Sequence, residues 1–148
     1  MSRIVGIDPG AARLGIAISD EDASIAFPRE TVAARGGVAE AARRVQEALD
    51  DDDVSLVVVG LPLRLDGTEG EAARRAKLLG DAIGDALGTE VVYWDERLTT
   101  VAAERSLREM GRRGAKQREV VDQSAATILL QGYLDAKKGG TWTNPKSD

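Results

Sequence analysis

Residues 1–20, MSRIVGIDPGAARLGIAISD, set the architecture of this chain. An apolar run at residues 4–7 is followed by the turn tripeptide Asp8-Pro9-Gly10, and a second apolar run covers residues 14–18. Apolar runs bounded by turn residues are typical of strands that are buried on both faces. The stretch therefore predicts a strand, a tight turn and a second strand.

Asp8 ends the first of these strands, at the rim of the predicted core. A charge at such a rim is costly unless something binds it. Asp is also a favoured first residue of a turn, which explains Asp8 without any function. The tripeptide alone favours the turn explanation, so the choice depends on the rest of the chain.

The composition limits the chemistry that this chain can perform. Its 148 residues suit one domain, which we expect at residues 1–138, followed by a flexible C-terminal tail at residues 139–148. The chain has no Cys and no His, which excludes disulfides, thiolate or imidazole metal ligands and His-dependent nucleophiles. Carboxylates, hydroxyls, Lys, Arg, backbone groups and hard metal ions remain. With no apolar stretch near the roughly 18–20 residues of a membrane span and no signal peptide, we expect a soluble cytoplasmic protein.

The charges are unevenly distributed. The formal net charge of −5 argues mildly against a nucleic-acid partner. However, four consecutive Asp residues stand at 50–53, while a basic arm covers residues 105–118. The basic residues of this arm are Arg105, Arg108, Arg112, Arg113, Lys116 and Arg118. A local basic arm on an acidic domain can contact phosphates, although a solvated helix face and linker explain it equally well.

The rest of the chain predicts further strands and helices. Residues 24–33 predict a third strand, which Pro28 confines to a sheet edge, and the Val-rich residues 54–60 predict a buried parallel strand. A helix is expected at 38–49, and a second runs from a capping box at Thr68 and Glu71 to residue 87. A strand at 91–94 follows, and then a helix from Thr99 or Thr100 to residue 110. A basic linker at 112–118 leads to a last helix at 119–136. This order predicts an α/β fold with a five-stranded mixed sheet, three antiparallel strands followed by two parallel ones, flanked by helices.

Two later sites add carboxylates to the same sheet edge. Asp95 and Glu96 end the last predicted strand as Asp8 ends the first, with one strand expected between them. The backbones would then be roughly 10 Å apart, which inward-leaning side chains can span around an ion. A solvated strand end with a local ion pair to Arg97 is the alternative explanation.

Asp122 lies on the apolar stripe of the last predicted helix. Helical spacing from it leads to the following residues: Ala125, Ala126, Leu129, Leu130 and Tyr133. An acid at the first turn of a helix is also stabilised by the helix dipole, so Asp122 alone is ambiguous. Three acids directed at one rim repel one another without a bound cation. Carboxylate ligands suit Mg²⁺ or Mn²⁺, which can activate water for phosphodiester hydrolysis, so we expect a metal-dependent nuclease.

Four blocks of the sequence resemble the YqgF (RuvX) family, in order and over nearly the whole chain. The first block is Gly6-Ile7-Asp8-Pro9-Gly10 with residues 13–20, and the second is residues 58–63 with Asp66-Gly67-Thr68-Glu69-Gly70. The third block is residues 95–100, and the fourth is residues 121–126 with residues 128–131 and 133–135.

The resemblance implies an RNase H-like fold and a nuclease that processes the 5′ end of pre-16S rRNA. It also implies an alternative, a Holliday junction resolvase acting on branched DNA. The family's acidic site falls on Asp8, Glu96 and Asp122, with Asp95 beside it, as catalytic and metal-binding residues. Its partners would be a structured rRNA precursor or branched DNA, with the ribosome as a further candidate, and the protein would act as a monomer or homodimer.

Two departures from the family pattern concern substrate contact. Ala11-Ala12 replaces the usual Thr-Lys after the first-block glycine, and Arg64 replaces the usual Asn of the second block. The candidate nucleic-acid-binding residues are Arg13, Arg64, Arg112, Arg113, Lys116 and Arg118.

Two other classes of protein compete with the nuclease. Sugar kinases and actin-like ATPases also open with Asp-x-Gly on a β-hairpin, and residues 61–70 could serve as their second phosphate loop. Such proteins duplicate the domain, and 148 residues leave no room for a second copy. The third class is a non-catalytic ribosome- or nucleic-acid-binding module, which has no need of buried acids.

Overall fold

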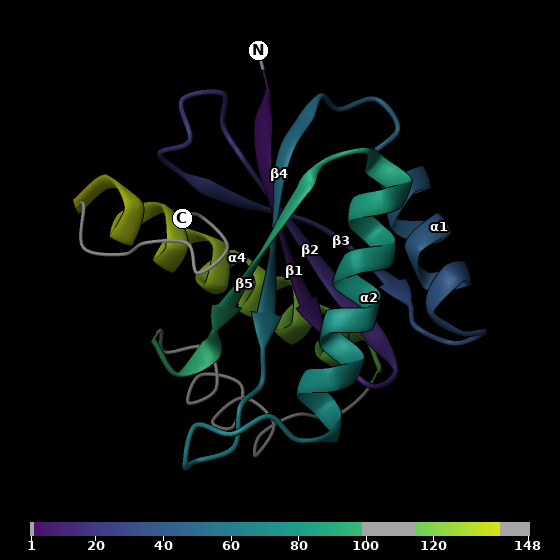
Figure 1. The fold of residues 1–148 in the computed structure, drawn as a ribbon. Helices are drawn as coiled ribbons and strands as arrows, with labels where there is room; N and C mark the ends of the chain where they lie inside the picture. Colours follow the sequence, from purple (N-terminus) through teal and green to yellow (C-terminus); the bar gives the residue numbers. More distant parts are fainter. Residues whose placement is uncertain (1, 99–114, 140–148) are drawn as a thin grey trace.

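The computed structural model describes residues 2–98 and 115–139, without the side chains of residues 115–124 and 139. A five-stranded sheet with the strand order β3-β2-β1-β4-β5 forms its centre (Figure 1). The strands are β1 (Arg3–Pro9), β2 (Arg13–Ser19), β3 (Ala26–Ala33), β4 (Val54–Leu61) and β5 (Glu90–Asp95). Strands β1, β2 and β3 are antiparallel, whereas β4 is parallel to both β1 and β5. The predicted mixed sheet is therefore confirmed, with β1 at its centre.

The turn of the first hairpin lies two residues later than the sequence predicted. Asp8 belongs to β1 and pairs with Gly15, while the Gly10 amide donates to the Arg13 carbonyl at 3.0 Å and closes the turn. A Cβ atom at Gly10 would lie 2.5 Å from that carbonyl oxygen, so only glycine fits there. Pro9 is tolerated because the β1 ladder with β4 ends at Ile7 and requires no donor from Pro9.

β3 is the edge strand that Pro28 predicted. Among the described strands it pairs with β2 alone, and the register shifts between Ile16 and Ala17, where Pro28 stands opposite Ala17. A proline without an N–H group is compatible with an edge strand and an irregular ladder.

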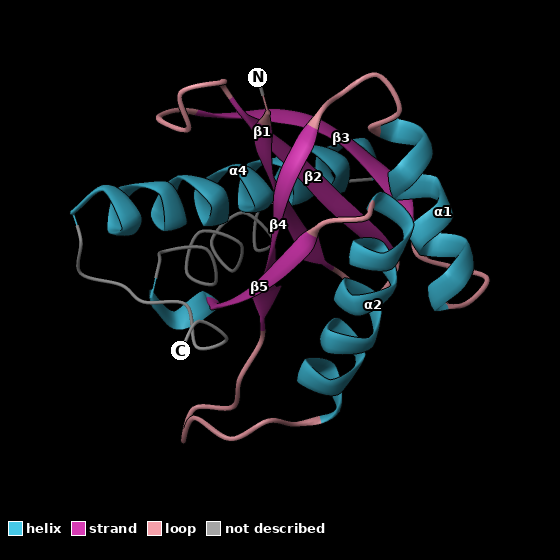
Figure 2. Cartoon of the chain, turned by 45° about the horizontal axis from the view of Figure 1, so that its top comes forward, coloured by secondary structure: helices cyan, strands magenta, loops and turns pink. Residues whose placement is uncertain are grey.

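Helices cover both faces of the sheet (Figure 2). Helices α1 (Val38–Ala48) and α2 (Glu71–Leu87) pack on one face, and α4 (Ala115–Gly139) packs on the other. The first core contains side chains such as Val5, Ile7, Val45, Val57, Val59 and Ile83. The second contains side chains such as Ala17, Val58, Val92, Trp94, Ala126, Leu129 and Leu130. No helix within the described ranges is long and apolar enough to cross a membrane.

The capping box predicted at Thr68 is wrong. Helix α2 begins at Glu71 with Gly70 as its N-cap, and no side chain caps it. The Thr68 amide, from which Glu71 would accept in a capping box, instead donates to the nearer Asp66 Oδ1 at 3.0 Å. The predicted end of the helix is confirmed, because Gly88 adopts a left-handed conformation with φ of 68°.

The last helix is longer than predicted. Helix α4 starts at Ala115 rather than at residue 119, so Lys116 and Arg118 belong to its first turn and not to a linker. The helix expected up to residue 110 lies outside the described residues, as do residues 112–114 and the predicted tail from residue 140. A short 3₁₀ helix, η1 (Glu96–Leu98), follows β5.

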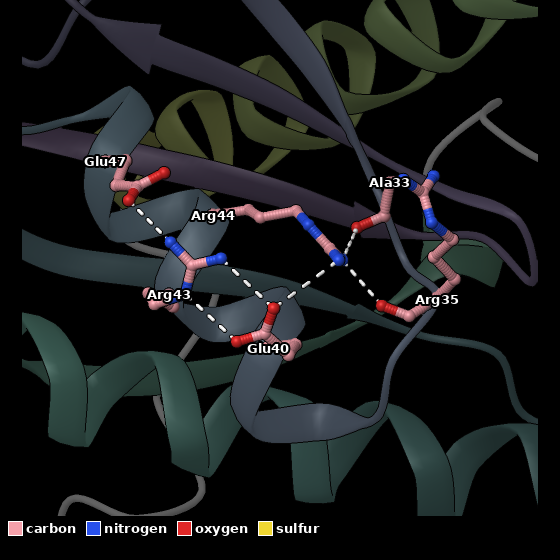
Figure 3. Close-up of polar contacts among 6 residues, drawn as sticks. All are labelled: Ala33, Arg35, Glu40, Arg43, Arg44 and Glu47. Carbon is pink, nitrogen blue, oxygen red and sulfur yellow. Dashed lines mark hydrogen bonds and ion pairs between the residues drawn. The ribbon is translucent and has the colours of Figure 1, made fainter.

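Arg44 fastens α1 to the end of β3 (Figure 3). Its Nη1 atom donates to the carbonyl oxygens of Ala33 at 2.9 Å and Arg35 at 2.6 Å, and Nη2 lies 3.7 Å from Glu40. Within the described part of the chain, the ion pairs of the neighbouring Arg43 join it to Glu40 and Glu47 of its own helix. Arg44 thus connects α1 to the end of β3, whereas the ion pairs of Arg43 lie within α1.

Replacing Arg44 by Ala should lower the free energy of unfolding by about 1–2 kcal/mol, because two backbone carbonyls lose a charged donor. Arg43→Ala is the matched control and should cost only about 0.5 kcal/mol, since exposed ion pairs on a helix contribute little. Urea denaturation followed by circular dichroism measures both values. Equal losses in the two variants would contradict the structural role of Arg44.

Candidate active site

The pleat of β1 directs Asp8 toward α4. Gly6, two residues earlier, faces that helix: a Cβ atom there would lie 2.8 Å from Leu130 Cβ and 3.3 Å from the Ala126 carbonyl oxygen. Side chains two residues apart in a strand share a face, so Asp8 also points to the α4 side. Its side chain is only 1% exposed. The carboxylate is therefore held inside the molecule at the end of the central strand.

Glu96 reaches the same face from β5. A Cβ atom at Gly60 would lie 3.2 Å from Glu96 Oε1 and 3.3 Å from Leu129 Cδ2, which places the Glu96 carboxylate over Gly60 and beside α4. Gly60 pairs with Trp94, whose indole belongs to the core under α4. Glu96 thus continues the row of side chains that Val92 and Trp94 begin.

The absence of a side chain at Gly60 makes room for the Glu96 carboxylate. Gly60 follows Val59, the partner of Ile7, so it stands on the strand between Asp8 and Glu96, in line with Asp8. A side chain at this position would press on Glu96. Sequence reasoning did not single out this residue, although a glycine that ends a Val-rich buried strand signals a close approach by another group.

The pKa values of Glu96 and its neighbour Asp95 shift in opposite directions. Burial raises the pKa of Glu96, and the nearby negative charge of Asp95 raises it further. Burial also pushes the pKa of Asp95 upward, but the hydrogen bonds and charge of Arg97 outweigh burial and leave this pKa below its usual value. Arg97 binds both oxygens of Asp95 at 2.8–3.1 Å. The ion pair considered as an alternative therefore exists, and Asp95 forms it with Arg97.

The helix that carries Asp122 has the predicted buried stripe. Ala125, Ala126, Leu129, Leu130 and Tyr133 are all at most 3% exposed. Asp122 lies in α4, one turn before Ala126, whose carbonyl oxygen approaches Gly6. The side chain of Asp122 lies outside what the structure describes.

The donor set suits a hard divalent cation. Asp8 and Glu96 supply only oxygen atoms, and the side-chain-free position Gly60 lies between them. Among the described side chains, no three acidic residues cluster closely enough to hold a metal by themselves. A site built on Asp8 and Glu96 thus needs a further ligand.

The candidate phosphate-binding residues fall into three groups. Arg13 begins β2 next to the hairpin turn and is partly exposed. Arg64 is exposed in the loop after β4, where its Nη1 donates to Thr68 Oγ1 at 3.3 Å. Lys116 and Arg118 lie in the first turn of α4, where the structure describes the backbone and not the side chains. Arg112 and Arg113 lie outside the described residues.

Comparison with known proteins identifies relatives over most of the chain. Residues 2–136 match the model of the RuvX family, which is described as a Holliday junction resolvase. A protein of Acetivibrio thermocellus is 45% identical, with 91% of this chain and 96% of that protein covered. One of Agathobacter rectalis is 42% identical, with 90% and 94% covered. Both bear the name "Putative pre-16S rRNA nuclease".

The fold is also that of a solved structure. The RuvC protein of T. thermophilus, in complex with a Holliday junction substrate, superposes with a TM-score of 0.59 at 20% identity, covering 95% of this chain and 98% of RuvC. This likeness confirms the RNase H-like fold.

The fold and the relatives together define a nuclease of the RNase H-like class. The chain belongs to the RuvX family. This assignment favours hydrolysis over the sugar-kinase alternative, because the family match covers the whole described sheet and α4 to residue 136.

Proposed function

We propose that this protein is a metal-dependent endonuclease that processes the 5′ end of pre-16S rRNA in the cytoplasm. The observation that carries the proposal is the pair of carboxylates, Asp8 and Glu96, on one sheet face across Gly60. Relatives that are 42–45% identical bear the name of a pre-16S rRNA nuclease. A pair of acids that offers only oxygen ligands, with Asp8 buried and Glu96 partly buried, at the carboxyl edge of parallel strands suits phosphodiester hydrolysis.

Asp8, Glu96 and Asp122 would hold Mg²⁺ or Mn²⁺, with Asp95 as a candidate beside them. Bound there, the metal supplies an activated water and stabilises the charge on the leaving oxygen. Asp8 contributes a carboxylate fixed by the central strand, and the nearby Asp95–Arg97 ion pair borders Glu96. Asp122 would supply a third carboxylate from α4.

Hydrolysis of branched DNA is the second candidate function. The description of the RuvX family as a Holliday junction resolvase favours it. A two-fold junction requires two active sites and thus a homodimer, whereas a single rRNA end requires only a monomer. A binding module without catalysis, on the ribosome or on nucleic acid, is the third candidate.

Parallel cleavage assays separate these functions. A precursor rRNA carrying the 5′ leader and a four-way DNA junction are each incubated with the protein and Mg²⁺, Mn²⁺ or EDTA. We expect metal-dependent cleavage of the precursor at the 5′ end of the small-subunit rRNA. Cleavage of the junction but not of the precursor would show that the substrate is branched DNA rather than RNA. Metal-independent binding without any cleavage would identify the module.

The basic arm should contribute to binding through backbone phosphates. Replacing Arg112, Arg113 and Lys116 together by Ala should flatten the plot of log K against log salt concentration by about 2–3 units, roughly one for each phosphate that the arm no longer neutralises. Fluorescence anisotropy with labelled substrate at several salt concentrations measures the slope. An unchanged slope would show that the basic arm is a solvated surface that contacts no phosphate.

A further inference from the structure

The Asp95 carboxylate is occupied on both oxygens by one neighbour, Arg97. Oδ1 accepts from the backbone amide of Arg97 at 2.9 Å and from its Nε atom at 3.1 Å, and Oδ2 accepts from Nε at 3.1 Å and from Nη2 at 2.8 Å. An ionised carboxylate offers about four lone-pair sites, so these contacts use the acceptor capacity of Asp95. A cation could bind Asp95 only by displacing a guanidinium that holds it at two points.

The contacts between Asp95 and Arg97 enclose Glu96. The hydrogen bond from the Arg97 amide to Asp95 Oδ1 closes an Asx turn, in which Glu96 is the central residue. The turn begins the 3₁₀ helix η1. Because the residues before and after Glu96 are joined, the turn restricts the direction of its side chain. That direction lays Glu96 Oε1 over Gly60, 3.2 Å from where a Cβ atom would stand.

Arg97 also anchors this turn to the loop between β4 and α2. Its Nη1 atom donates to the Leu65 carbonyl oxygen at 3.4 Å, and a Cβ atom at Gly67 would lie 3.6 Å from both Nη1 and Nη2. The loop is itself hydrogen-bonded, since the Arg64 amide donates to the Thr68 carbonyl at 2.9 Å and the Gly67 amide donates to the Arg64 carbonyl at 2.8 Å. The end of β5 therefore has a second support outside its own strand, and Arg97 provides it.

We propose that Arg97 is a positioning residue, which acts through Asp95 to hold the Glu96 carboxylate at the candidate active site, and that Asp95 serves this purpose and is not a metal ligand. This inference rests on the proposed nuclease function and deepens it, because it separates Asp95 from the metal-binding carboxylates. A planar guanidinium that binds both oxygens of a carboxylate fixes its position and its orientation. Partners that orient a metal ligand typically contribute about 10- to 100-fold to metal affinity or activity.

Nuclear magnetic resonance tests the position of Glu96 without metal or substrate. A nuclear Overhauser effect between the Glu96 Hγ and Gly60 Hα protons is expected in the wild type, because Glu96 Cγ lies 3.4 Å from where a Gly60 Cβ atom would stand. Arg97→Ala should lose this effect. Arg74→Ala is the matched control and should keep it, since Arg74 forms an exposed ion pair with Glu71 at 2.9 Å. An effect that persists in Arg97→Ala would overturn the proposal.

Mn²⁺ binding separates positioning from ligation at Asp95. The side-chain oxygen of Asn can still accept from the Arg97 amide, so Asp95→Asn keeps the turn around Glu96. We expect this variant to bind Mn²⁺ less than about 10-fold more weakly than the wild type, as measured by the electron paramagnetic resonance signal of free Mn²⁺. A loss as large as that of Asp8→Asn would show that Asp95 is a metal ligand and would overturn the proposal.

Cleavage kinetics test whether Arg97 acts through Asp95. Arg97→Ala and Asp95→Ala should each lower kcat roughly 10- to 100-fold with KM changed less than about twofold, because Glu96 is displaced while substrate binding is not. The double variant should lose no more than either single variant, since both changes remove the same contact. Arg97→Lys should recover only part of kcat, because an ammonium keeps the charge but not the two-point hold.

Losses that multiply in the double variant, or a rise in KM at constant kcat, would contradict the positioning role. Failure of the wild type to cleave either substrate and to bind Mn²⁺ would refute the proposed function. The nuclear Overhauser effect between Glu96 and Gly60 would still decide the role of Arg97, because it requires neither metal nor substrate.

Discussion

Replacing Asp8 by Asn should reduce hydrolysis by at least about 10³-fold while leaving the fold intact. Asn has nearly the same shape, so the buried position at the end of β1 stays filled, but a neutral amide is a poor ligand for a hard cation. A loss of this size corresponds to about 4 kcal/mol of transition-state stabilisation, which is within the contribution of a catalytic metal ion. The measurement is the initial rate of substrate cleavage with saturating Mn²⁺, together with a circular dichroism spectrum.

Metal binding supplies a second measurement on the same variant. At ten times the dissociation constant, Mn²⁺ should stabilise the wild-type protein by about 1.4 kcal/mol, or roughly 3–6 °C in the unfolding midpoint. Asp8→Asn should lose this shift. Asp50→Asn, in the exposed acidic loop after α1, is the control and should keep both the shift and the activity. Full activity of Asp8→Asn would refute the metal-dependent mechanism.

Replacing Gly60 by Ala should reduce activity roughly 10- to 100-fold at a modest cost in stability. The new Cβ atom would lie 3.2 Å from Glu96 Oε1, so the carboxylate has to move by a few tenths of an ångström or more. Small displacements of catalytic groups can cost about two orders of magnitude in rate. The same Cβ atom would lie 3.3 Å from Leu129 Cδ2, and this crowding should destabilise the fold by about 1–2 kcal/mol.

A double variant separates the two effects of Gly60→Ala. Adding Leu129→Val shortens the crowded side chain and should recover part of the lost stability, as measured by urea denaturation. It leaves the contact with Glu96 in place, so cleavage should stay slow. If Leu129→Val restored the activity as well, the defect would be one of packing on α4, and Gly60 would have no special role toward Glu96.

Local patterns predicted the strands well because each signal was short-ranged. Two apolar runs around Gly10 predict a hairpin wherever they occur, and Pro28 excludes a central strand by lacking a donor. The run of valines in β4 likewise predicts a buried parallel strand after a helix. These expectations are confirmed because the sheet uses each segment in agreement with its own propensity.

The failures occurred where two local interactions competed for one group. Thr68 and Glu71 have the spacing of a capping box, but Asp66 is two residues from Thr68 and forms the turn with it instead. The sequence contains both possibilities, and the geometry of the loop after β4 selects one. The hairpin turn differs for a similar reason, because pairing with Gly15 draws Asp8 into the strand.

The candidate site could be predicted only in part. The residue pattern indicated Asp8, Asp122 and the pair Asp95 and Glu96, and only the resemblance to the RuvX family chose Glu96 over Asp95. The structure engages Asp95 with Arg97 and lays Glu96 over Gly60. Neighbouring residues at a strand end point in different directions, so a one-residue difference in where β5 ends exchanges their roles.

The sequence alone specifies which chemistry is available and which segments form strands. A chain without His or Cys has only hard oxygen ligands for a metal, and its four motif blocks match one family in order. It took the folded arrangement to establish that Asp8 and Glu96 share the α4 face, that Gly60 makes room for the Glu96 carboxylate, and that Arg97 joins Asp95 to the loop after β4. The physical reason is that the face on which a side chain lies depends on the register of three adjacent strands, and register is set by packing between segments far apart in the chain.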